Sequence, residues 1–210
     1  MMSKKNSKPG DVKQRIFDEA IRLFGESGYE GTSIQAISEA VGIRKPSLLY
    51  HFSSKDELRE AVIVKLIAAW AEELPRLLTN AKSGHDRFSS TITSVVEFFL
   101  EDRNRARLAI REMMDRPTEI QAVVRERLSP WTKMLVEYIL MGQGSGVIKA
   151  EVEPQAYLTQ VMMMIIGTVA VGGVAGSMLG ADNETIEPMI KELVRIAREA
   201  LFVDKSKKES

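Results

Sequence analysis

The segment from Arg44 to Lys55 places cationic, hydroxyl and aromatic side chains where a short helix would turn them outward. Lys45 and Arg44 could donate to guanine acceptors or to phosphates, and Leu49 could contact a thymine methyl group. Lys55 would stand in the first turn of a further helix, where the helix dipole opposes a cation unless an external anion such as a phosphate compensates it. The candidates for contact with nucleic acid in this segment are Arg44, Lys45, Pro46, Ser47, Leu49, Tyr50, His51 and Lys55.

Each of these side chains, taken singly, also has an ordinary structural explanation. Lys45 and Lys55 could be solvated surface charges, and His51 could be a hydrogen-bonded structural residue. Gln35 is open to two interpretations, because its amide could fold back onto its own helix cap or contact a phosphate. The combination of residues still favours DNA as the partner.

Two helices joined by a tight turn must position these side chains. Thr32 followed by Gln35 fits a capping box, so a helix is predicted to begin there and to break at Gly42. A helix-turn-helix needs such a bracing helix, a turn, and a second helix whose N-terminal residues reach base edges in the major groove. The sequence therefore predicts a helix-turn-helix over residues 33–52.

The second helix is predicted from about Lys45 to Phe52. Its apolar pair, Leu48 and Phe52, shares a face at i and i+4 and should point inward. A first helix should precede these two, since Ile16, Ala20, Leu23 and Phe24 form one apolar stripe that stops at Gly25 and Gly28. Ser54 with Glu57 makes a second capping box, which should open a long fourth helix.

Residues 32–58 read T-S-I-x-x-I-x-x-x-V-G-I-x-K-x-S-L-x-Y-H-F-x-x-K-x-x-L, which resembles the DNA-binding signature of TetR-type transcriptional repressors. The resemblance covers residues 11–60. It implies a homodimer that presents one recognition helix per subunit to a palindromic operator in double-stranded DNA. It also implies a divergent C-terminal domain that dimerises and binds a small-molecule effector. By position, it assigns DNA contacts to Ser33, Gln35, Lys45, Ser47, Tyr50, His51 and Lys55.

Two residues depart from this pattern. Arg44 stands where family members often have Ser or Thr, and Leu49 stands where an aromatic residue is frequent. The operator sequence therefore cannot be inferred from a relative.

The composition sets broad limits on the function. The chain has 210 residues, 44% of them hydrophobic, with 29 basic and 29 acidic residues, so bulk charge neither supports nor excludes DNA. There is no cysteine. The chain has two histidines, His51 and His85, and neither has other possible ligands at metal-binding spacing around it. We expect no metal, no cofactor and no enzymatic activity, and, since the first residues lack a secretory signal, a cytoplasmic location.

The stretch from Val161 to Ala181 is apolar and long enough to span a membrane. Acidic residues flank it on both sides, no aromatic belt brackets it, and no positive-inside asymmetry is present. We expect a helix buried in a core or between subunits, and no membrane partner.

Helical periodicity without strand signals predicts an all-α fold. Beyond the first four helices, Gly and Pro positions predict helices at about 86–101, 103–115, 118–142, 154–179 and 185–202, with Pro130 kinking or dividing the third of these. The expected organisation is a disordered basic arm (1–10), a DNA-binding domain (11–58), an effector-binding and dimerisation domain (59–203) and a disordered tail (204–210).

The last two helices are the candidates for a dimer interface. A stripe of apolar residues on the final helix could pack across a two-fold axis, and glycines every four residues on its predecessor would permit close approach. A core helix of a monomer would explain the same stripe. The candidates are Gly172, Gly176, Ile186, Ile190, Leu193 and Ala197.

The effector candidates are apolar and pliable residues with a few polar ones that could orient a ligand. They are Trp70, Phe98, Arg107, Arg111, Met114, Trp131, Met134 and Met163. A hydrophobic effector, acyl or aromatic, is preferred. The alternative is a DNA-binding regulator without an effector, architectural or activating, which a well-packed C-terminal core would favour.

Overall fold

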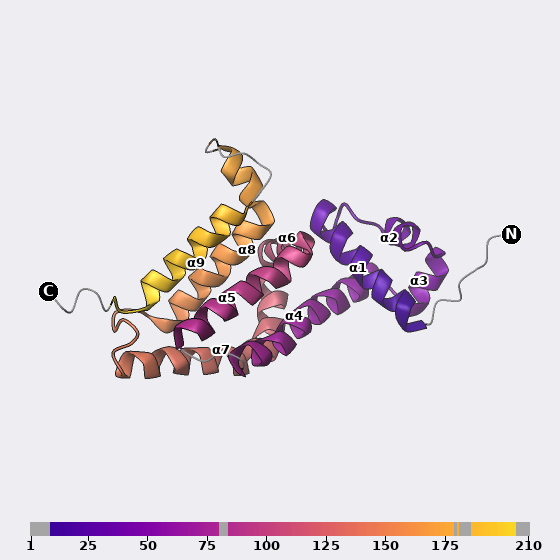
Figure 1. Ribbon diagram of the computed structural model, residues 1–210. Helices are drawn as coiled ribbons and strands as arrows, with labels where there is room; N and C mark the ends of the chain where they lie inside the picture. The colour runs from indigo at the N-terminus through magenta and orange to yellow at the C-terminus, as the bar shows by residue number, and fades with distance from the viewer. Residues whose placement is uncertain (1–8, 80–83, 179, 181–185, 205–210) are drawn as a thin grey trace.

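The computed structural model describes residues 9–79, 84–178, 180 and 186–204. Within them the fold is all-α, as predicted. The helices are α1 (Pro9–Ser27), α2 (Ile34–Val41), α3 (Lys45–His51), α4 (Lys55–Thr79), α5 (Gly84–Glu101), α6 (Arg103–Asp115), α7 (Pro117–Gly144), α8 (Pro154–Met178) and α9 (Glu187–Leu201). Figure 1 shows α1, α2 and α3 gathered at one end and α4 leading from them into a body of α5 to α9.

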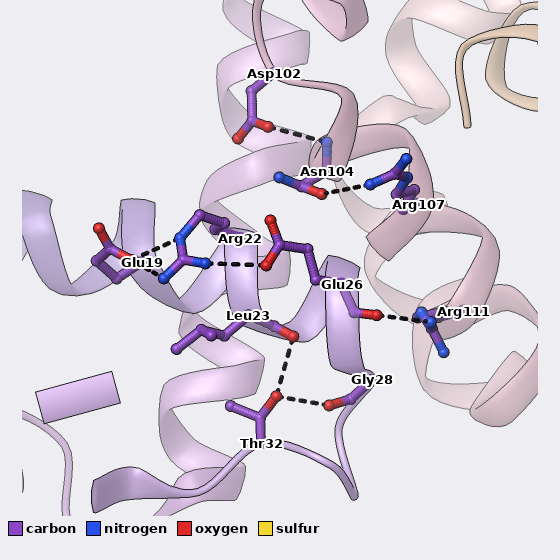
Figure 2. A network of polar contacts seen from close by, with 10 residues as sticks. All are labelled: Glu19, Arg22, Leu23, Glu26, Gly28, Thr32, Asp102, Asn104, Arg107 and Arg111. Atoms are coloured by element: carbon purple, nitrogen blue, oxygen red, sulfur yellow. Dashed lines mark hydrogen bonds and ion pairs between the residues drawn. The ribbon is translucent and has the colours of Figure 1, made fainter. Parts of the chain in front are cut away.

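The start of α2 lies one residue later than the capping box at Thr32 predicts. Ser33 is the N-cap, and its Oγ accepts a hydrogen bond from the backbone N–H of Ala36 at 3.0 Å. Thr32 is buried instead, and its hydroxyl lies 3.0 and 2.8 Å from the carbonyl oxygens of Leu23 and Gly28 (Figure 2). Because Thr32 satisfies carbonyls at the end of α1, the next hydroxyl along the chain caps α2.

The second predicted cap is confirmed. The backbone N–H of Glu57 donates to Ser54 Oγ at 3.0 Å. The Glu57 carboxylate reaches one residue farther back than a capping box requires, and it accepts from the backbone N–H and hydroxyl of Ser53 at 2.7 and 2.5 Å. These bonds lower the pKa of Glu57.

One core joins the N-terminal end, formed by α1, α2 and α3, to the body. Its buried members include Ile16, Ile37 and Leu48 from the first three helices together with Leu108 of α6 and Leu128 of α7. The boundary at residues 58 and 59 stays a prediction, and this core crosses it. α1 begins at Pro9, inside the segment predicted to be a disordered arm, whereas residues 1–8 and 205–210 lie outside the described residues.

Pro130 was predicted to kink or divide this helix, and α7 runs through it as one undivided helix. A proline inside a helix removes one hydrogen bond and costs about 3 kcal/mol. Leu128 and Trp131, on either side of it, pack against the first core, which holds the helix together across the lost bond.

α8 is long and apolar enough to cross a membrane by length and composition alone. One face of it packs in a second core, through Ile165, Ile166 and Val169, against α5, α6 and α9. Its opposite face carries exposed apolar side chains, including Val171 and Val174. The apolar residues around α8 therefore form one face buried in the core and one face exposed on the surface.

Candidate functional site

α3 presents an exposed surface because Leu48 and Phe52 anchor its inner side. Both are buried, as predicted, and the Phe52 ring meets the ring of Phe17 on α1 edge to face at 5.5 Å. Pro46 lies in the first turn, where a missing N–H costs nothing, and Arg44 is the N-cap in extended conformation. The helix is thus fixed against α1 with its outer residues free.

The outer residues of α3 form what we call the recognition surface: Arg44, Lys45, Pro46, Ser47, Leu49, Tyr50 and His51. Tyr50 is 88% exposed, although an aromatic side chain normally gains by burial. The ring of half-buried His51 contacts it edge to face at 5.6 Å. The structure brings these predicted residues together, and their contact with DNA stays a prediction.

The turn before α3 depends on a glycine and on a cation. Gly42 has φ +75°, in the left-handed region, and its N–H faces the carbonyls of Glu39 and Ser38. The Arg15 guanidinium donates to the Val41 carbonyl, where the C-terminal end of the α2 dipole favours a positive charge. Arg15 is therefore a bracing residue of the helix-turn-helix.

Lys55 has a structural partner that the sequence did not reveal. Its Nζ donates to the carbonyl oxygens of Tyr29 at 2.9 Å and Thr32 at 3.0 Å, and it lies 3.9 Å from the centre of the Tyr29 ring. The two carbonyls and the ring compensate the charge of Lys55, so it needs no external phosphate at this helix start, contrary to the prediction. A phosphate contact by Lys55 stays a prediction without that support.

Ser33 and Gln35 both lie at the exposed start of α2. The Gln35 amide donates to the Glu39 carboxylate at 2.6 Å, one turn along the helix, and does not fold back onto the cap. The Ser33 hydroxyl accepts the capping bond and keeps its own proton available to a partner.

α6 holds the end of α1 directly. A Cβ placed on Gly25 would lie 2.8 Å from Asn104 Cβ, so the absence of a side chain permits this close approach. The Arg111 guanidinium donates to the carbonyls of Gly25 at 3.2 Å and Glu26 at 3.3 Å, and Figure 2 shows it directed at the last turn of α1. Arg111 therefore lies at the junction between the N-terminal end (α1, α2 and α3) and the body.

Two further ion pairs lie at this junction. Arg59 of α4 pairs with Glu112 of α6, and both side chains are buried. Burial raises the pKa of Glu112, and the charge of Arg59 opposes that rise. Arg116 lies 3.7 Å from Asp56 and 4.8 Å from the centre of the Tyr29 ring.

Half-buried Tyr29 lies against the charged residues of the junction. Desolvation is the largest cause and a hydrogen bond with Asp56 the second, and they raise the pKa of its hydroxyl to about 12. Lys55 and Arg116 both lie over its ring. The segment between α1 and α2 is therefore fixed by contacts with α4 and with the end of α6.

A cavity of about 240 Å³ lies one helical turn from the Arg59–Glu112 pair. Ile63 lies four residues after Arg59, and Met113 follows Glu112 directly, so both helices of the ion pair also form the cavity wall. Its lining residues are Ile63, Leu66, Ile67, Trp70, Phe98, Phe99, Ala109, Met113, Ile120, Gln121, Val124, Leu128 and Ile166.

Known proteins resemble the N-terminal helices in sequence and most of the chain in fold. Residues 16–62, from α1 into α4, match the family described as bacterial regulatory proteins, tetR family. The N-terminal helices form a TetR-type DNA-binding domain. Within it, 47 residues are 49% identical to the biofilm operon icaADBC negative transcriptional regulator IcaR of Staphylococcus epidermidis. That match covers 22% of this chain and 25% of the relative.

Solved structures resemble the whole chain. FadR from Bacillus subtilis, in complex with stearoyl-CoA, has a TM-score of 0.68 at 15% identity over 89% of this chain and 98% of its own. A Saccharomonospora viridis protein in complex with choline has a TM-score of 0.69 at 17% identity over 93% of this chain and 100% of its own. Identities this low show a shared fold behind the TetR-type domain and nothing about its ligand.

The cavity behind the TetR-type domain includes two of the predicted effector residues, Trp70 and Phe98. Trp131 packs against the first core without lining the cavity. The other candidates point away from the cavity. Arg107 lies in a shallow depression with Arg103, and Arg111 of α6 binds the last turn of α1. Met114, Met134 and Met163 are exposed.

The predicted dimer residues of α9 face into the same chain. Ile186, Leu193 and Ala197 are buried and Ile190 is half-buried in the second core. The burial of Ile186, Leu193 and Ala197 removes them from a surface open to a partner and corrects their assignment, whereas Ile190 stays a predicted interface residue. The exposed apolar face is instead formed by residues here called the α8 stripe: Met163, Val171, Val174 and Met178.

The assignment of the two α8 glycines to a dimer interface stays a prediction. A Cβ on buried Gly172 would meet Met189 at 3.5 Å, which is an ordinary contact within the chain. Gly176 is half-buried, one turn farther along. Within this chain, Gly172 shows no close approach of helices like that at Gly25.

The ion pair of Arg59 and Glu112 at the junction was missed from the sequence. Arg59 lies four residues before Ile63, and Glu112 lies four residues after Leu108, so both occupy apolar helical stripes. A charge on such a stripe predicts a buried partner of opposite sign. That signal was available, although it could not have identified which two charges meet.

Proposed function

We propose that this protein is a cytoplasmic DNA-binding transcriptional regulator, a repressor released from a palindromic operator by a small apolar effector. The observation that carries the proposal is the recognition surface of α3, which is anchored by Leu48 within a TetR-type domain. Lys45 and Ser47 at its N-terminal end have the position from which a recognition helix reaches base edges. Tyr50 and His51 lie at the opposite end, suited to phosphates.

A homodimer follows from the α8 stripe. An operator with two-fold symmetry requires two recognition helices related by the same symmetry. The α8 stripe offers the exposed apolar side chains that an isologous helix pair buries, and exposed Ile196 of α9 adds another. The stripe replaces the buried α9 residues as the proposed contact.

Effector control follows from the position of the cavity. A ligand that displaces Met113 or Ile63 acts on helices whose adjoining residues, Glu112 and Arg59, hold the DNA-binding end. If the displaced arrangement binds the ligand better, the population shifts away from the spacing that fits DNA. The cavity itself favours this over a regulator without an effector, for which a filled core would be expected.

The experiment that tests the proposal is a DNA titration at several salt concentrations, on genomic fragments selected by the purified protein. Lys45→Ala should weaken binding and reduce the salt slope by about one, as expected when one phosphate or base contact from a lysine is lost. Lys133→Ala, at an exposed position on α7, is the matched control and should change neither. Equal affinity and slope for both variants would contradict the recognition surface.

A further inference from the structure

Two cationic side chains near the start of α1 lie beside α3. Lys13 and Arg15 are both exposed, and both contact the helix-turn-helix although neither belongs to α2 or α3. Figure 1 shows α1 beginning next to α3 at the N-terminal end of the molecule. Both residues precede the signature over residues 32–58, which assigned them no contact with DNA.

Lys13 lies at the C-terminal end of α3. Its Nζ is 5.6 Å from the centre of the Phe52 ring, and Phe52 is the C-cap of α3. The bonds from Ser53, and to a smaller extent the charge of Lys13, lower the pKa of Glu57, so Lys13 lies close to the segment that joins α3 to α4. An ammonium group has three N–H donors, and no acceptor in the described part of the chain bonds to those of Lys13. Its donors are therefore free beside the end of α3 that carries His51.

Arg15 lies at the opposite end of α3. Its guanidinium donates to the Val41 carbonyl, and a Cβ placed on Gly42 would lie 3.7 Å from its Nη2, so the group covers the turn that precedes α3. A guanidinium has five N–H donors, and the bond to Val41 occupies one of its nitrogens. No acidic residue in the described ranges forms an ion pair with Arg15. Its charge and its other donors are therefore open to an anion from outside the chain.

The two cations lie at the two ends of the helix that the proposed function places in the major groove. α3 has 7 residues, so its length is about 10 Å. The major groove is about 12 Å wide and has a row of phosphates along each wall, so a cation beside either end of such a helix has a phosphate within reach. A lysine ammonium binds phosphate as a point charge, and an arginine guanidinium binds it with two parallel N–H donors.

We propose that Lys13 and Arg15 bind backbone phosphates on the two sides of the recognition surface, so that α1 takes part in holding DNA. The proposal rests on the proposed function, in which α3 enters the major groove. Lys13 contacts a phosphate beside the C-terminal end of α3. Arg15 contacts a phosphate beside the turn, where its bond to Val41 holds the guanidinium. Such contacts add affinity for DNA of any sequence and carry no preference for particular bases.

The first test compares Lys13→Gln with Lys65→Gln in the intact chain. Lys65 of α4 is the matched control, because it is half-buried and lies over the same Phe17 ring, at 4.2 Å against 6.0 Å for Lys13. Lys13→Gln should weaken DNA binding about three- to tenfold at about 0.1 M salt and lower the salt slope by about 0.9 per bound subunit. The loss should be equal for the selected genomic fragments and for a random-sequence duplex, since a phosphate contact is blind to sequence. Lys65→Gln should change neither affinity nor slope.

The second test separates the phosphate contact of Arg15 from its bracing of the turn. Arg15→Lys keeps the charge and should retain the slope, whereas Arg15→Gln should lower the slope by about 0.9 per bound subunit. Loss of the brace alone would weaken binding in Arg15→Gln at an unchanged slope, because the number of released counterions would be the same. Melting temperatures show whether each variant folds. If Arg15→Gln does not fold, the result for Lys13→Gln decides whether α1 contacts DNA.

The slope of Lys45→Ala, measured alongside, separates this inference from the proposed function. Wild-type slopes in Lys13→Gln and Arg15→Gln, together with a lowered slope in Lys45→Ala, would overturn the inference alone. A slope lowered in only one of the two α1 variants would overturn the arrangement on both sides of α3. An effect of Lys65→Gln as large as that of Lys13→Gln would overturn it too, because any nearby charge would then suffice. No DNA binding by the wild type would contradict the proposed function as well.

Discussion

Arg59 of α4 and Glu112 of α6 form an ion pair whose side chains are 5% and 7% exposed. The pair joins the helix that continues from the DNA-binding end to the helix that holds the end of α1. Glu112→Gln should lower the free energy of unfolding by about 3–5 kcal/mol, since it leaves the Arg59 charge buried without an anion. Urea unfolding of the variant measures this change.

The double replacement Arg59→Met with Glu112→Leu is the control for that prediction. Apolar side chains of similar volume remove both charges, so most of the lost stability should return. A loss below about 1 kcal/mol in Glu112→Gln would show that the pair is solvated and contradict its burial.

Lys55 is predicted to act through stability more than through DNA. Lys55→Met removes the hydrogen bonds to the Tyr29 and Thr32 carbonyls and should lower the free energy of unfolding by about 1–3 kcal/mol. The salt slope of DNA binding should stay unchanged, whereas Lys45→Met should reduce the slope at unchanged stability. The reverse outcome, a smaller slope without a loss of stability in Lys55→Met, would restore the phosphate contact.

The cap at the start of α4 predicts a pH dependence. The pKa of Glu57 is lowered in the folded chain by its bonds from Ser53, so the unfolded state binds the proton more tightly. The contribution of the cap is therefore complete above the ordinary pKa of a glutamate and is lost as the pH falls through that value toward the lowered one. Melting temperatures of the wild type and Glu57→Gln should converge in this acidic range, and a constant difference down to low pH would contradict the cap.

Filling the cavity should remove ligand binding without disturbing the fold. Ala109→Leu places three more carbon atoms against the cavity space and should raise the free energy of unfolding by about 1 kcal/mol. It should also abolish the binding of a small apolar probe such as isopropylbenzene, measured by calorimetry. Ala122→Leu, at an exposed position of α7, is the matched control for helix propensity. Retained probe binding in Ala109→Leu would show that the probe site lies elsewhere.

The α8 stripe predicts a dimer that one charge can break. Val174 is 68% exposed, and Val174→Glu would bury two carboxylates in a two-fold interface. The dimer dissociation constant should rise on the order of 100-fold, measured by analytical ultracentrifugation. Leu140→Glu, on the exposed surface of α7, should leave it unchanged. A wild-type monomer at micromolar concentration, or a Val174→Glu variant as dimeric as the wild type, would contradict this assignment.

The DNA-binding end could be predicted from the sequence because local patterns determine it. The spacing of Leu48 and Phe52 gives the inner side of α3, and Ser54 with Glu57 gives the start of α4, within one turn of chain. The start of α2 was displaced by one residue because Thr32 is held by carbonyls of α1. That competition involves a separate helix and leaves no local signal.

The body could be predicted only as a set of helices. An apolar stripe such as Leu193 and Ala197 shows that something covers it, without showing whether the cover is the same chain or a second copy. Both Trp70 and Met114 were likewise predicted as effector-site residues from their residue types alone. One lines the cavity and the other is 75% exposed, because the rotation of each helix about its axis is set by tertiary packing.

The most direct test of the account is a protection footprint on genomic DNA selected by the purified protein. Two protected half-sites related by a dyad, separated by about one helical turn or a compatible multiple, are predicted for the wild type. Lys45→Ala and Val174→Glu should both lose this protection, one through the recognition surface and the other through the dimer. A single protected stretch without a dyad, or protection that survives both substitutions, would contradict the account.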